Sequence, residues 1–217
     1  MKKLVPLVAV LVAAAALAAC SAPSLPSGVL PTNDVVPAGQ GSPPTLSKYL
    51  VPYTSMVISN PDWTKQPTPP SSVAIYAPKG CDAATTNFAQ LNFVPDAYEV
   101  LVGCPKTSDI NVLYSQVNWS KLQAAGWKPV SGYGSYGTGS RAYVQFDAYP
   151  NDGGEGCWAY LDLFKSENVL GFTAYCDQLL SGVTSLPDVK KAAEQWTASA
   201  LHQITTEQAG PAKTVTI

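Results

Sequence analysis

Two neighbouring segments of the chain, 156–164 and 169–176, each carry one cysteine, and their pattern limits the folds that are possible. Both are rich in aromatic and β-branched residues, and four polar residues separate them, which predicts a β-hairpin. Strands that pair across this four-residue loop place Cys157 opposite Cys176 on one face of the hairpin. A disulfide between neighbouring strands requires that geometry, so we expect this bridge.

The other two cysteines of the body, Cys81 and Cys104, would then form a second bridge. Four cysteines allow three pairings, and reduced thiols or a metal site are the alternatives. The spacings contain no C-x-x-C pair and the chain has one histidine, which disfavours zinc. We therefore predict two disulfides, each closing a loop of about 20 residues and stabilising the fold by about 3 kcal/mol.

The N-terminus predicts export. Lys2 and Lys3 precede an apolar run, residues 4–19, which is shorter than the roughly 20 residues that a membrane-spanning helix needs. The run ends in Leu17-Ala18-Ala19-Cys20, which resembles the bacterial lipobox. The resemblance implies that Cys20 receives a diacylglycerol thioether and begins the mature protein, so that membrane lipid is a partner of the chain. A plain secretory leader that ends near a cysteine is the alternative.

Charge excludes one class of function. Only 13% of the residues are charged and the net charge is -2, whereas nucleic-acid-binding domains usually carry a clustered basic surface. Loss of Lys2 and Lys3 with the leader would make the net charge more negative by two, because residues 1–19 contain no carboxylate. We expect attachment by two acyl chains, without electrostatic attraction to anionic lipid, at the extracytoplasmic face of the cell membrane.

Composition divides the chain into four regions. Residues 1–19 are the predicted lipoprotein signal peptide, and 20–45 are the lipidated cysteine with a tether rich in proline and serine. Such a tether breaks helices and sheet ladders and buries no core of its own. Residues 46–210 form the predicted globular domain, and 211–217 are a C-terminal tail.

Apolar periodicity predicts the elements of this domain. Ala84, Phe88 and Leu91 fall on one face of a helix over 82–93. Alternation in 141–149 predicts a strand that leads directly into the cysteine hairpin. The predicted class is α+β, with a small antiparallel sheet, a meander of about three to five strands, helices packed on one face and two disulfides.

Further elements follow from shorter patterns. We expect strands at 98–102 and 127–130 and a helix at 119–125 that Gly126 ends. The last helix begins after Ser185, a good N-cap residue. One face of that helix carries an apolar stripe, which we expect to pack on the sheet: Val189, Ala193, Trp196, Ala200 and Ile204.

A glycine-rich stretch, Gly132 to Gly137, matches G-x-G-x-x-G. In a nucleotide site a helix follows this motif, whereas a predicted strand follows it here, which disfavours nucleotide. The remaining interpretations are a flexible loop between strands and a loop whose tyrosines, Tyr133 and Tyr136, contact a partner, because tyrosine gives a large contact area at low entropic cost.

No catalytic set emerges. His202 lies away from the apolar stripe of the last helix, so we expect it to face solvent. A pair of carboxylates such as Asp147 and Asp162, on neighbouring predicted strands, is the arrangement that an envelope hydrolase acting on a sugar bond would need. That hydrolase is the alternative to a non-catalytic function.

The turn 151–156 contains Asp152 and Glu155. Carboxylates on a turn can bind calcium, but this segment lacks a twelve-residue ligand pattern and has ordinary turn chemistry. We predict no metal and no cofactor.

The overall plan resembles actinobacterial and mycobacterial cell-envelope lipoproteins, with an Ala-rich signal, a lipobox, a Pro/Ser tether and a cysteine-stapled body. Within that group, Cys81-Asp82 and Phe172-x-x-x-Cys176-x-x-Leu179-Leu180 are similar to LppA-type lipoproteins. The resemblance implies a membrane-anchored, exported, non-catalytic protein that binds a lipid, glycan or protein partner. Of the functional residues, it carries over only Cys20.

Overall fold

The computed structural model describes residues 26, 28–30, 41–59, 62–65, 77–90, 95–148, 156–178 and 185–210. In chain order its elements are a 3₁₀ turn η1 (Leu46–Lys48), α1 (Tyr53–Ser59), β1 (Trp63–Lys65), β2 (Asp82–Gln90), β3 (Asp96–Gly103), α2 (Thr107–Ser115), α3 (Trp119–Ala124), β4 (Lys128–Pro129), β5 (Thr138–Ala148), β6 (Gly156–Ser166), β7 (Val169–Asp177) and α4 (Leu186–Ala209).

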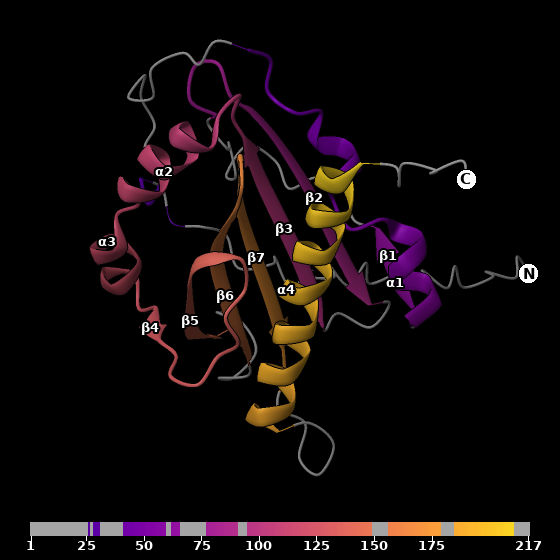
Figure 1. Cartoon of the computed structure of the whole chain (residues 1–217). Helices are drawn as coiled ribbons and strands as arrows, with labels where there is room; N and C mark the ends of the chain where they lie inside the picture. Colours follow the sequence, from indigo (N-terminus) through magenta and orange to yellow (C-terminus); the bar gives the residue numbers. More distant parts are fainter. Residues whose placement is uncertain are drawn as a thin grey trace, which may run out of the picture.

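The described strands form one antiparallel sheet in the order β1-β2-β3-β7-β6-β5-β4 (Figure 1). This confirms the α+β class and the meander, which is β5-β6-β7. The predicted size of three to five strands is wrong, because the sheet has seven. The meander does not end at β7: β3 pairs with residues 169–176 of β7, and β2 and β1 then extend the sheet beyond it.

The predicted helix over 82–93 is wrong, because residues 82–90 form strand β2. The residues Ala84, Thr86 and Phe88 alternate on one face, and Thr86 and Phe88 are buried there. β2 pairs with β3 over eight residues. Pairing with the apolar strand β3 therefore outweighs the local helical spacing of three apolar side chains.

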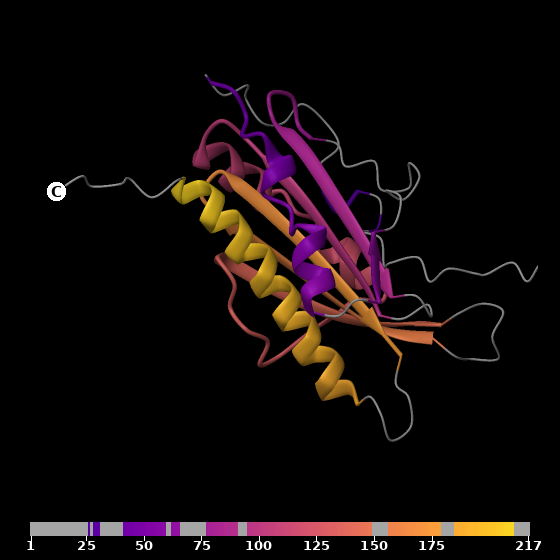
Figure 2. The same ribbon diagram turned by 90° about the vertical axis from the view of Figure 1, so that its right-hand side faces the viewer.

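Helices cover both faces of the sheet, which corrects the prediction of helices on one face. The apolar stripe of α4 packs on one face, against Phe88, Leu101 and Phe164. On the opposite face, Leu122 of α3 packs with Leu161, and α2 packs beside it near the start of β7. Figure 2 shows α4 lying along its face of the sheet.

The cysteine hairpin has a different register from the one expected. Ser166 pairs with Val169, so the loop has two residues, Glu167 and Asn168, in place of four. Glu167 has the left-handed backbone (φ 49°) that such a tight turn needs. The shift is two residues, which keeps every side chain on its predicted face.

Both predicted disulfides are present. Because of the register shift, Cys157 is bonded diagonally to Cys176, which itself pairs with Ala159, and the two Cα atoms are 5.8 Å apart. The other bridge joins Cys81 to Cys104, with a Cα separation of 4.3 Å.

The bridged Cys104 is also tied to the hairpin loop. The backbone N–H of Cys104 donates to the carbonyl of Asn168, and the Asn168 side chain donates back to the carbonyl of Cys104 at 2.9 Å. The disulfide Cys81–Cys104 is therefore linked to the tip of the other disulfide-bridged hairpin.

Segments ahead of the sheet pack on both faces. Leu46, Tyr49 and Val51 join the core beneath α4. Val29, within the region predicted to be a tether, is fully buried in the core beneath α3, and its carbonyl accepts a hydrogen bond from the Asn118 N–H at 2.8 Å. The described residues 26 and 28–30 therefore lie against the body.

Candidate functional site

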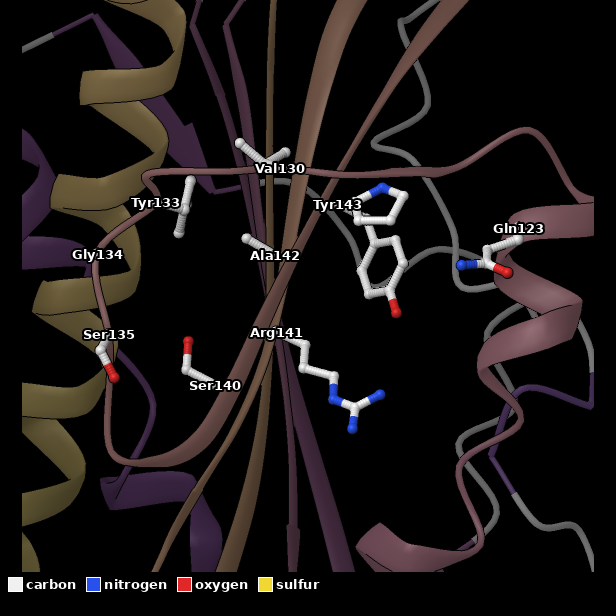
Figure 3. A pocket seen from close by; sticks show the side chains of 10 residues that line it. Gln123, Val130, Tyr133, Gly134, Ser135, Ser140, Arg141, Ala142 and Tyr143 are labelled. Carbon is white, nitrogen blue, oxygen red and sulfur yellow. The ribbon is translucent and has the colours of Figure 1, made fainter.

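A cleft of about 430 Å³ lies between β5 and the loop that joins β4 to β5 (Figure 3). The loop forms one wall, β5 forms the floor and α3 borders the far side. The lining residues are mostly polar: Gln123, Pro129, Val130, Tyr133, Gly134, Ser135, Ser140, Arg141, Ala142 and Tyr143.

The loop wall is held in place by α4. The N–H of Gly134 donates to the Glu194 carboxylate at 2.8 Å, and the Lys190 ammonium donates to the carbonyl of Gly132 at 2.6 Å. Lys190 and Glu194 also form an ion pair. These contacts tie the first half of the glycine-rich stretch, residues 132–134, to one turn of the helix.

The two loop tyrosines are half-buried and turned toward the body. The Tyr133 ring stacks on Tyr160 of β6 with centroids 6.1 Å apart, and Tyr136 meets Tyr133 edge-on. Burial raises the pKa of Tyr133. Much of their surface is therefore used within the protein, and their contact with a partner stays a prediction.

The floor of the cleft contains a serine fixed by a buried acid. The Ser140 hydroxyl lies 2.9 Å from each carboxylate oxygen of Asp162, whose side chain is fully buried. Burial raises the pKa of Asp162 to about 7, and the Ser140 hydrogen bond lowers it in part. When Asp162 is ionised the hydroxyl must donate to it, so Ser140 presents its lone pairs as an acceptor for a ligand hydroxyl.

Arg141 supplies the positive charge of the cleft. Its guanidinium lies over the Trp119 ring, 4.5 Å from the centroid, and Trp119 stacks in turn on Tyr143. Among the described side chains, Arg141 forms no ion pair. A stacked guanidinium keeps N–H groups at its edge that can bind a carboxylate or phosphate.

These walls suit recognition of a polar ligand. The cleft combines a cation, a fixed hydroxyl, the amide of Gln123 and the backbone of the glycine-rich loop. Sequence analysis pointed to the loop tyrosines but missed Ser140, Arg141 and Gln123. Those three come together because β4, which follows α3, pairs with β5. This pairing covers only two residues of β4, so no pattern in the sequence predicts it.

The carboxylate pair considered for a hydrolase is not brought together. Asp162 pairs across the strands with Ala142, whereas Asp147 pairs with Cys157. These positions lie five residues apart along β5, about 17 Å at the rise of a strand, against about 5–10 Å in glycosidases. The other candidate acids, Asp152 and Glu155, lie outside the described residues.

Two further carboxylates, unexpected from the sequence, are buried on opposite faces of β3. Glu99 of β3 is fully buried, and one of its oxygens accepts a hydrogen bond from the Val51 N–H at 2.9 Å. Burial raises the pKa of Glu99 to about 8 and that of Asp96 to about 7. Both sit within the core and away from the lining of the cleft.

The other residues singled out in the sequence lie outside the cleft or outside the described residues. Cys20 lies outside the described residues. His202 is exposed on α4, beside a smaller hollow of about 330 Å³. In the described part of the chain, no three side chains of the metal-binding types gather in one place, and none of the helices has the length and apolar character to cross a membrane.

No protein-family model matches the chain, and no curated protein matches it. Several solved structures, including the following three, are similar at low identity. The extracellular domain of PknH from Mycobacterium tuberculosis is 12% identical, with 73% of this chain and 94% of that domain covered and a TM-score of 0.46. A protein from Bacteroides thetaiotaomicron is 10% identical (60% and 39% covered, TM-score 0.32), and an Rv0999 ortholog from Mycobacterium smegmatis is 11% identical (70% and 95% covered, TM-score 0.31).

Proposed function

We propose that this chain is an exported, lipid-anchored protein of the cell envelope that binds an acidic glycan without catalysing a reaction on it. The lipid anchor rests on the lipobox that ends at Cys20. The ligand class rests on the cleft, where the Arg141 guanidinium and the fixed Ser140 hydroxyl lie on one strand.

A glycan fits this cleft better than an acyl chain or a protein segment does. The lining is mainly polar, so an acyl chain would leave polar groups without partners. Sugar hydroxyls can satisfy Ser140 and Gln123, and a carboxylate or phosphate on the glycan can pair with Arg141. The faces of the aromatic rings nearby are already stacked within the protein, so recognition is polar.

A titration of the mature protein with soluble peptidoglycan fragments, which combine sugar hydroxyls with carboxylates, tests this function. We expect saturable NMR shift changes confined to the loop 130–136 and β5. Arg141→Gln should weaken binding by about tenfold or more, since hydrogen bonds to charged groups contribute about 1.5–3 kcal/mol. Lys191→Gln, on the exposed side of α4, is the matched control and should bind normally.

Two outcomes would contradict the proposal. One is shift changes that fall elsewhere or do not saturate. The other is release of cleaved sugar during the titration, which would show catalysis and revive the hydrolase alternative.

A further inference from the structure

The region predicted to be a tether is attached to the body at Val29, nine positions after the predicted anchor, Cys20. The Val29 side chain is fully buried beneath α3, and its carbonyl accepts the Asn118 N–H immediately before that helix. Leu30 packs on the same core. The attachment therefore has both an apolar and a hydrogen-bonded component.

This attachment shortens the free linker, which we call the leash, between the lipid-bearing Cys20 and the body. Pro26, the first described residue, lies six positions after Cys20, and the chain between them spans at most about 20 Å when fully extended. A leash that ran free from Cys20 to residue 45 would allow several times that distance. A body fastened at Val29 must therefore stay close to the membrane that holds the acyl chains, with α3 near the point of attachment.

The surface beside this point is basic. We define the α2–α3 face as Lys106, Lys121 and the exposed residues of α2; Gln123 of α3 lines the cleft and is not part of this face. Those two helices contain a single acid, Asp109, which is buried. Lys106 and Lys121 are exposed, and Lys121 reaches toward Gly28 of the fastened segment.

One neighbouring cation extends this surface, because Lys165 reaches α2 and donates to the Asn111 side chain. The opposite helix, α4, carries acids among its basic residues, including Asp188, Glu194 and Glu207. The net charge of the whole chain is negative, but the α2–α3 face is basic. The net charge therefore does not exclude an attraction between this face and anionic lipid.

We propose that Pro26 and residues 28–30 act as a clamp that holds the α2–α3 face on the membrane, where Lys106 and Lys121 contact the phosphates of anionic phospholipids. The inference rests on the proposed lipid anchor at Cys20. The short leash limits the distance between the body and the membrane. The attraction between the lysines and the anionic lipid phosphates determines which face of the body meets the membrane. Lysines near an anionic membrane surface each favour contact by about fivefold.

Lysine footprinting on the acylated, mature protein tests the clamp. The protein is placed in phosphatidylcholine vesicles with or without phosphatidylglycerol and treated with a water-soluble acylating reagent. We expect Lys106 and Lys121 to react about fivefold more slowly in the phosphatidylglycerol vesicles, while Lys191 on α4 reacts equally in both. Equal reactivity of Lys106 and Lys121 in the two vesicles would overturn the proposal.

Two variants separate the clamp from the fold. Val29→Asp should release the segment and abolish the protection. A variant with a long Gly-Ser insertion between Cys20 and Pro26 leaves the body untouched and should also weaken it. Protection that survives both changes would contradict the clamp.

The intact mass of the same sample distinguishes this inference from the proposed function. A chain without diacylglycerol on Cys20 would refute the proposed anchor. An acylated chain with unprotected lysines would refute the clamp alone.

Discussion

Glu99 and Asp162 lie in one row across the sheet, on either side of Thr173, and both are fully buried beneath α4. The Thr173 hydroxyl lies 2.7 Å from that of Thr197 on the helix. One oxygen of Glu99 has no hydrogen-bond partner among the described groups. This polar row inside an apolar layer makes the protonation state of the core a determinant of stability.

The first prediction concerns pH. Burial raises the pKa of Glu99 to about 8 and of Asp162 to about 7, from ordinary values of 4.5 and 3.8. The folded chain therefore binds more protons than the unfolded chain between about pH 4 and 8. Its free energy of unfolding should fall as pH rises through this range, by up to about 1.4 kcal/mol per pH unit for each group, and level off above about pH 8. Urea unfolding at pH 5, 7 and 9 measures this.

Neutral variants provide the control for that prediction. Glu99→Gln and Asp162→Asn keep acceptors for Val51 and Ser140 but cannot ionise. Together they should reduce the pH dependence between 5 and 9 to the slope that remains from Asp96 and Asp177, because burial raises the pKa of those two carboxyls to about 7 and about 6. Glu207→Gln, at a more exposed position on α4, should leave the dependence unchanged. A slope in the double variant that is as steep as in the parent protein would contradict the assignment to Glu99 and Asp162.

The second prediction concerns the loop wall of the cleft. Glu194→Ala removes the acceptor for the Gly134 N–H and the ion pair with Lys190. We expect faster amide exchange at 132–137 and weaker binding of peptidoglycan fragments, with a loss of unfolding free energy of no more than about 1.5 kcal/mol. Glu207→Ala also breaks an ion pair on α4, with Lys48, and should leave the loop unchanged. Equal loop exchange in both variants would mean that α4 does not hold the loop.

The third prediction compares two glycines of the same loop. Gly137 and Gly132 both have left-handed backbones, with φ of 56° and 66°. A Cβ on Gly137 would meet the backbone carbonyl of Lys165, whereas a Cβ on Gly132 meets nothing. Gly137→Ala should therefore destabilise the fold by more than the roughly 1 kcal/mol of conformational strain that Gly132→Ala introduces. Thermal unfolding of both variants measures the difference, and equal losses would argue against the contact.

The fourth prediction concerns the disulfides. Replacement of Cys157 and Cys176 by serine opens a loop with a sequence separation of 19 and should cost about 3 kcal/mol of unfolding free energy. Replacement of Cys81 and Cys104 opens a separation of 23 and should cost a similar amount. Peptide mapping without reduction checks the pairing itself. Recovery of a Cys81–Cys157 or Cys104–Cys176 peptide would refute it.

The disulfide pairing could be predicted from the sequence even though the hairpin register could not. A shift of two residues preserves which face each side chain occupies, so Cys157 and Cys176 stay within reach of each other. The helix predicted over 82–93 failed for the opposite reason. Its periodicity was local, whereas the strand β2 is fixed by pairing with β3, which no short pattern in 82–90 reveals.

The cleft was less predictable than the fold. Tyr133 stood out because its neighbours are glycines, but Arg141 and Ser140 look like ordinary strand residues. Their role depends on a two-residue strand, β4, that positions the loop. The buried Glu99 and the fastened Val29 were invisible for the same reason, since an isolated acid or an apolar residue among prolines usually lies in solvent.

Export and anchoring at Cys20 underlie the proposed function and the membrane clamp, and intact mass spectrometry of the protein purified from its native membranes tests them directly. The account predicts a chain that begins at Cys20 and carries a diacylglycerol group, incorporates a palmitate analogue and retains both disulfides. A mature chain that begins at any other residue, or that carries no lipid, would contradict it.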